Sequence, residues 1–251
     1  MVCFATSRQN KKFRTQILQT LNSEKADHAF KFPKSAEAAK FEEAIKEVGQ
    51  TPHASPIDRA IADAYSLQKA GEAEKAIEKW RSIAYLMEGI DSRGAASAWF
   101  SAGYLLSGNP EEAISAYDQA IRLNPRNSPA YTNRGSAKNS LGQHKEAIKD
   151  YGEAIRLDPE NSLAYSNRGS AKSDLGQHEE AINDCDEAIH LNPYNAIFYI
   201  NRGIAKAGSG HIDEAQPDFQ TALRLAREAG DDELVTKISN KIREINNSGI
   251  K

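Results

Sequence analysis

The 251-residue chain contains little of what would point to a disulfide-bonded, membrane or secreted protein. Two cysteines are too few for a disulfide framework, and this count is typical of a reducing compartment. No apolar run reaches the roughly 18 residues that a membrane-spanning helix needs. The first 30 residues lack the apolar core of a secretory signal. These absences predict a cytoplasmic protein with no membrane span.

Motifs of catalysis and cofactor binding are missing as well. The chain has no glycine-rich phosphate loop, no nucleophile motif and no pair of cysteines at metal-binding spacing. Its net charge of −3 gives no reason to expect nucleic acid as the main partner. We therefore expect no enzyme, no cofactor and no metal site.

What the chain does contain is an internal repeat. Residues 128–161 and 162–195 are two copies of one 34-residue unit and are identical at about 23 positions. Each copy predicts two helices, which in the first copy cover roughly residues 129–141 and 145–157, with Gly142 between them. Pro159 ends the second helix because proline lacks an amide donor and clashes with the preceding turn. A fixed period of this length predicts a stacked array of helix pairs.

The pattern of aromatic and small residues resembles the tetratricopeptide repeat. That signature has a large aromatic residue, Gly, Ala, an aromatic residue, Ala and Pro, in this order. The matching residues are Tyr131, Gly135, Ala147, Tyr151, Ala154 and Pro159, then Tyr165, Gly169, Ala181, Cys185, Ala188 and Pro193. Arg134 and Arg168 depart from it, standing where the family usually has Leu, as do Lys138 and Lys172, where it usually has Tyr. The resemblance implies an all-α fold, a right-handed superhelical solenoid of antiparallel helix pairs.

The resemblance divides the chain into an extension, an array and a cap. The array covers residues 57–229 as five repeats: a degenerate one at 57–90, then 96–127, 128–161, 162–195 and 196–229. Residues 231–246 have one apolar stripe, which predicts a capping helix, with a partner-binding helix as the alternative.

Residues 1–56 do not match the repeat. Helical spacing of apolar residues predicts a short helix around 13–21 and a second at 35–48, where Ala38, Phe41, Ile45 and Val48 share one face. The stretch 51–56 contains two prolines and is typical of a connector. This basic extension is expected to pack on the array or to be partly disordered. The alternatives are a contact to an acidic partner and an organelle-targeting segment.

An arginine before the repeat glycine predicts an ion pair inside each repeat. Because the two helices run antiparallel, it should lie near the residue before the second-helix aromatic. The first repeat exchanges the signs of the two charges, as a contact predicts. The alternative is a row of arginines that binds a ligand. The predicted pairs are Arg134 with Asp150, Arg168 with Asp184, Arg202 with Asp218, and Asp63 with Lys79.

In tetratricopeptide proteins an extended peptide commonly lies on the concave surface lined by the first helices. The resemblance implies that Asn133, Asn167 and Asn201 form a row there, since a carboxamide can both donate to and accept from a peptide main chain. The alternative is that these residues hydrogen-bond neighbouring helices. The other expected groove residues are Thr132, Ser136, Asn139, Ser166, Ser170, Asp174, Ile200, Ile204, Phe100 and Tyr104.

These observations predict a non-catalytic adaptor that holds a peptide or helix of another protein in the groove. The lysines and arginines with which some chaperone-binding relatives grip a C-terminal carboxylate are not found at the corresponding sites. Two alternatives remain: a self-associating assembly protein, hence a homo-oligomer, and an effector system in which residues 1–56 act and the repeats sense.

Overall fold

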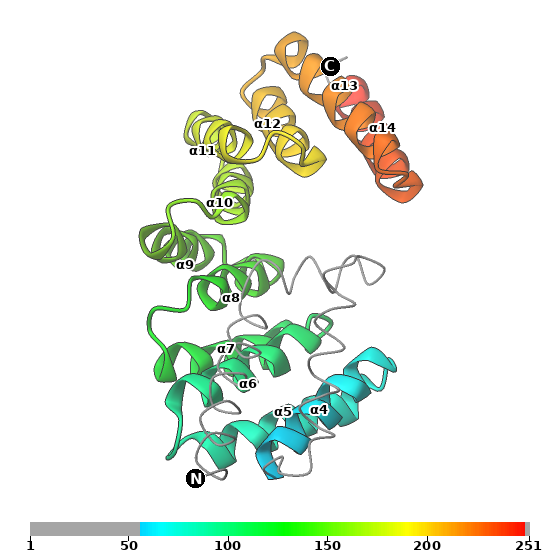
Figure 1. Cartoon of the computed structure of the whole chain (residues 1–251). Helices are drawn as coiled ribbons and strands as arrows, with labels where there is room; N and C mark the ends of the chain where they lie inside the picture. The colour runs from blue at the N-terminus through cyan, green and yellow to red at the C-terminus, as the bar shows by residue number, and fades with distance from the viewer. Residues whose placement is uncertain (1–55, 249–251) are drawn as a thin grey trace. The chain divides into compact units, whose positions relative to one another are not determined.

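The computed structural model describes residues 56–248, and the helices expected around 13–21 and 35–48 lie outside this range. The described residues form eleven α-helices and no strand, which confirms the all-α prediction (Figure 1). In chain order they are α4 (Pro56–Lys69), α5 (Ala73–Met87), α6 (Ser92–Leu105), α7 (Pro110–Leu123), α8 (Ser128–Ser140), α9 (His144–Leu157), α10 (Ser162–Asp174), α11 (His178–Leu191), α12 (Ala196–Gly208), α13 (Ile212–Glu228) and α14 (Asp232–Ser248).

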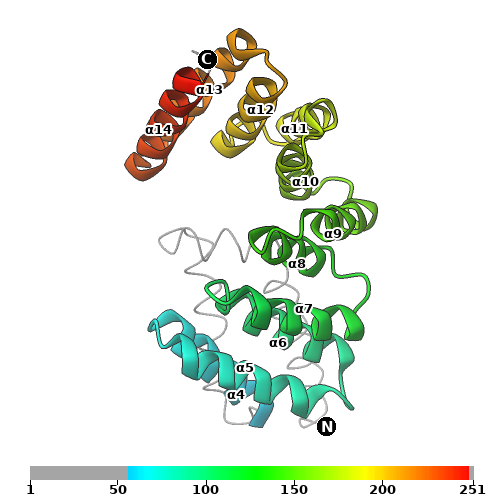
Figure 2. The ribbon, with the colours of Figure 1, turned by 180° about the vertical axis from the view of Figure 1, so that it is seen from behind.

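The chain divides into two compact units, the N-terminal unit up to Ala137 and the C-terminal unit from Lys138. Each contains consecutive helices that pack as pairs, α4 with α5 and α6 with α7 in the first, α10 with α11 and α12 with α13 in the second. The helix expected at 231–246 is α14, which packs along α13 (Figure 2).

Local sequence explains where the helices begin and end. Gly142, Gly176 and Gly210 have φ of 73°, 76° and 89°, in the left-handed region that glycine enters without steric cost. They therefore separate the two helices of a repeat. At the helix starts, Asn109 accepts a hydrogen bond from the amide of Glu112, and Asn161 accepts one from Ala164.

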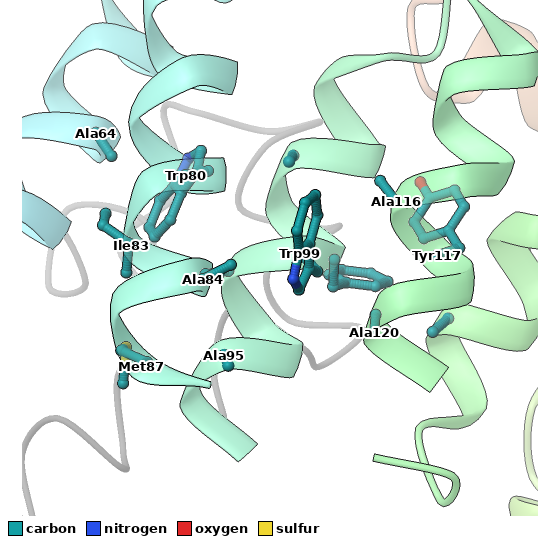
Figure 3. Packing of buried hydrophobic residues seen from close by; sticks show 14 of the residues in the cluster. Ala64, Trp80, Ile83, Ala84, Met87, Ala95, Trp99, Ala116, Tyr117 and Ala120 are labelled. Carbon is teal, nitrogen blue, oxygen red and sulfur yellow. The ribbon is translucent and has the colours of Figure 1, made fainter. Parts of the chain in front are cut away.

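The core of the N-terminal unit alternates large aromatic side chains with alanines. Trp80, Trp99 and Tyr117 are buried on α5, α6 and α7. Figure 3 shows Trp99 between Ala84 and Ala120, whose small side chains leave room for the indole. The helices of this unit are therefore held together by aromatic rings packed against alanine methyl groups. Such packing is sensitive to side-chain volume.

The core of the C-terminal unit uses the same repeat position, filled by Tyr151, Cys185 and Phe219, all buried. Burial and the neighbouring Asp184 raise the pKa of the Cys185 thiol to about 12, so this cysteine is an inert core residue. A Cβ on Gly203 would lie 2.7 Å from the Phe219 ring. Glycine is thus needed there for close approach of the two helices.

Candidate functional site

Two neighbouring first helices of the C-terminal unit carry most of the expected binding residues. Helices α10 and α12 contact each other. Asn167, Ser170 and Asp174 recur along one side of α10, and Asn201 and Ile204 hold the places equivalent to Asn167 and Ser170 on α12. All are half-buried except Asp174, which is exposed. We call these five residues the α10–α12 face.

Asn201 links the two helices of this face. Its Nδ2 donates to Oγ of Ser166 at 2.9 Å, and Ser166 is fully buried. Ser166 therefore does not line an open surface, because its hydroxyl lies between the helices. The alternative prediction for the asparagines was a hydrogen bond to a neighbouring helix, and Asn201 makes such a bond. Within residues 56–248 no group donates to its Oδ1, so this carbonyl oxygen can accept from a ligand.

In the N-terminal unit, two expected groove residues belong to the core. Phe100 is 7% exposed and packs against Tyr117 with ring centroids 5.8 Å apart. Thr132 is also buried, and its hydroxyl donates to the carbonyl of Ser128 at 3.2 Å. These two expectations need correction, because the side of the first helix that bears them packs inward. Tyr104, Asn133 and Ser136 are half-buried.

Ile200, also expected in the groove, instead packs in the apolar cluster that holds the terminal helix α14. Together with Tyr199 it packs against a cluster of Ala196, Ala222, Leu225, Ala226 and Ile238, which α12, α13 and α14 supply. Ile200 is drawn into this cluster because the apolar stripe of α14 packs against apolar side chains of α12 and α13. Ile200 therefore belongs to the contact with the cap.

His144 contacts two of the expected binding residues. Its Nδ1 lies 2.7 Å from Oδ1 of Asn139 in its own repeat and 3.7 Å from Oδ2 of Asp174 in the next. Thirty residues separate His144 from Asp174, so the period of 34 gave no signal for this contact. In the described part of the chain no group of three or more His, Cys, Asp or Glu side chains could hold a metal ion. None of the described helices has the length and apolarity to cross a membrane.

The arginines of the C-terminal unit bind carboxylates of their own repeats. Arg168 donates to Asp184 through Nε at 2.8 Å and Nη2 at 2.7 Å, and Lys172 reaches the same carboxylate at 2.8 Å. Arg202 likewise donates to Asp218 through Nε and Nη2. Asp218 also accepts from Lys206 at 2.9 Å. The carboxylates of Asp184 and Asp218 are both buried.

The remaining predicted pairs differ in exposure and in partner. Lys79 lies 3.3 Å from Asp63, and both are exposed enough for the pair to contribute little. Asp150 accepts from Lys138 at 2.7 Å. Arg134 and Asp150 lie in different units, so their pairing stays a prediction.

Two arginines also reach the second helix of the preceding repeat, which sequence analysis missed. Arg202 donates to Asp186 at 2.6 Å and Arg134 to Asp118 at 2.7 Å, each across 16 residues. Burial alone would lower the pKa of Arg202, but its bonds to Asp218 and Asp186 outweigh this and raise it. These groups are occupied by the chain's own acids, which argues against an arginine row that binds a ligand.

One repeat lacks the backward contact, and this gives a prediction. Gly152 stands 16 residues before Arg168, where the other repeats have Asp118 and Asp186. A Cβ there meets nothing within 4 Å. Gly152→Asp is expected to raise the free energy of unfolding by about 0.5–1 kcal/mol, from a less flexible helix and a new ion pair. Urea unfolding measures it, with Gly152→Asn as the uncharged control. If Asn stabilises as much as Asp, the contact does not form.

Comparison with known families gives repeat models along the array. Residues 96–127, 116–149 and 162–195 match models described as tetratricopeptide repeat, and residues 135–175 match one described as TPR repeat. Residues 192–248 match a model described as anaphase-promoting complex subunit 5. No curated protein matches the sequence.

Solved structures of similar fold include those of MamA and YrrB. A crystal structure of MamA is 23% identical, with a TM-score of 0.58, and covers 66% of this chain and 96% of its own. MamA 41-end from Desulfovibrio magneticus RS-1 is 18% identical, with a TM-score of 0.60, and covers 68% and 96%. YrrB, described as a TPR protein with an unusual peptide-binding site, is 20% identical, with a TM-score of 0.57, and covers 79% and 99%. At these identities the likeness shows the fold alone.

Proposed function

Because the chain is a tetratricopeptide repeat protein, we propose that it is a non-catalytic interaction scaffold which binds an extended peptide segment of another protein on the α10–α12 face. The observation that carries the proposal is Asn201. Its amide nitrogen is held by buried Ser166, which orients the side chain, while Oδ1 is left to accept a peptide N–H. YrrB, a neighbour by fold, is described as having a peptide-binding site, which supports the same use of the fold.

The chemistry of the face favours a ligand bound through its main chain. Ser170 and Asn201 carry neutral hydroxyl and amide groups, which can pair with peptide groups of any sequence. Ile204, half-buried beside them, suits one apolar side chain of the ligand. Arg168 and Arg202 are engaged with carboxylates, so an anionic tail is a poor fit.

The test compares one binding variant with one buried control. The full chain is used to capture partners from its native lysate, and a peptide from the captured protein is then titrated by calorimetry. Asn201→Ala is expected to weaken the peptide about fivefold to tenfold, the value of one hydrogen bond. Ser166→Ala removes the same internal hydrogen bond from a position that no ligand can touch.

The control separates a binding role from a structural one. If Asn201→Ala loses clearly more affinity than Ser166→Ala, which removes only the hydrogen bond that orients Asn201, Asn201 contacts the peptide. If both variants lose it equally, Asn201 acts only by joining α10 to α12. If neither variant changes the affinity, the peptide binds elsewhere and the proposal is overturned.

A further inference from the structure

An exposed apolar patch lies at the end of α5, in the N-terminal unit. Tyr85, Leu86 and Ile90 are 67%, 62% and 78% exposed, although most apolar side chains of this helix are buried. Leu86 and Ile90 are four residues apart, and Tyr85 packs its ring edge-on against Trp99 with centroids 5.1 Å apart. We call these three residues the α5-end patch. Three large apolar side chains with this exposure within six residues of sequence indicate an interaction site.

The patch lies beside the point where the described chain begins. Helices α4 and α5 pack together and are joined by a three-residue turn at 70–72, so they run antiparallel. Counted from Gly71, Leu86 lies at the level of Pro56 and Tyr85 at the level of Ile57. Ile57 and Met87 belong to the same cluster, which agrees with this register. The chain that precedes Pro56 is therefore attached next to the patch.

The preceding chain carries a segment of matching chemistry. Residues 35–48 have Ala38, Phe41, Ile45 and Val48 at helical spacing, which gives one apolar face about three turns long. Only residues 49–55 separate this segment from α4, and seven residues span at most about 25 Å. A short tether of this kind keeps the effective concentration of the segment at the patch in the millimolar range. A weak apolar contact is then sufficient for docking.

We propose that the apolar face of residues 35–48 docks on the α5-end patch in the same chain. The contact buries Phe41 and Ile45 against Tyr85, Leu86 and Ile90 and extends the core of the N-terminal unit by one helix. It gives the extension a function in covering the first repeat, as α14 covers the last. A second copy of the chain and a separate partner protein are the other candidates for this patch, and the experiment distinguishes them.

Amide hydrogen exchange of the full chain tests the docking from the segment side. Leu86→Asp with Ile90→Asp places two charges in the patch, at positions whose exposure leaves the core untouched. We expect exchange in residues 38–48 to become about tenfold faster or more, because two aliphatic contacts are lost. Tyr194→Asp, a change at a side chain 82% exposed in the turn before α12, is the matched control and should leave this exchange unchanged.

A thiol reporter tests the docking from the patch side. Gly89→Cys, in a chain that also has Cys3→Ser, places a reactive group among the patch residues, where a Cβ meets nothing within 4 Å. Cys185 is buried and does not compete. Phe41→Asp with Ile45→Asp is expected to speed maleimide labelling of this thiol several-fold.

Four results would overturn the proposal. One is wild-type exchange in residues 38–48 as fast as in an unstructured peptide. Another is exchange that stays slow in the folded Leu86→Asp, Ile90→Asp variant. The third is a drop in sedimentation mass of that variant with unchanged exchange in 38–48, which would assign the patch to a contact between copies. A captured protein that competes for the patch in a chain whose segment is not protected would assign it to a separate partner.

Discussion

Asp218→Ala is expected to destabilise the C-terminal unit by about 3 kcal/mol. Asp218 is 3% exposed and accepts from Arg202 and Lys206. Without it, two cations remain close together and poorly solvated, and breaking a buried pair in this way costs about 3–5 kcal/mol. We expect the lower end of this range, because Arg202 keeps its bond to Asp186.

The control is a second carboxylate bound by Arg202, that of Asp186. Asp186→Ala removes a carboxylate that is 52% exposed, so the expected loss is below about 1 kcal/mol. Both Trp80 and Trp99 lie in the N-terminal unit, so the C-terminal unit is followed by hydrogen exchange of α12 and α13 during urea unfolding. Equal losses for Asp218→Ala and Asp186→Ala would mean that burial does not set the strength of these pairs.

Trp80→Ala is expected to destabilise the N-terminal unit by about 3–5 kcal/mol. The indole is fully buried and its Nε1 donates to Oε1 of Gln68 at 3.2 Å, which ties α5 to α4. Removal leaves a cavity in a core that also contains Ala64, Ile83 and Ala84 (Figure 3). Packed neighbours relax only partly into such a space, so the loss should lie within the range for aromatic truncation.

The measurement uses the tryptophan that remains. Trp99 fluorescence should report unfolding at a lower urea concentration in Trp80→Ala, while exchange in α12 and α13 stays near the wild-type rate, since repeats contact only their neighbours. Trp80→Phe keeps most of the ring and loses the hydrogen bond, so a smaller loss is expected. If exchange in α12 and α13 accelerates as much as unfolding of the N-terminal unit, the two units unfold as one and the local account fails.

The sequence by itself determined what lies within one repeat. The period of 34, the turn glycines and the closing prolines predicted the helix pairs, and the helices of the 128–161 repeat begin one residue earlier than expected, at Ser128 and His144. The charge pattern predicted which acid lies near Arg168 and near Arg202, because two antiparallel helices joined by a short turn have only one register. These features do not depend on how neighbouring repeats are arranged in space.

Only the tertiary structure decided what lies between repeats and at their surface. The burial of Phe100, Thr132 and Ser166, the contact of Ile200 with the cap, and the backward bond of Arg202 to Asp186 all depend on how one pair stacks on the next. A sequence period gives the order of residues around each helix but not the rotation between successive pairs. That rotation decides which side of a first helix faces a neighbour and which side remains open to a ligand.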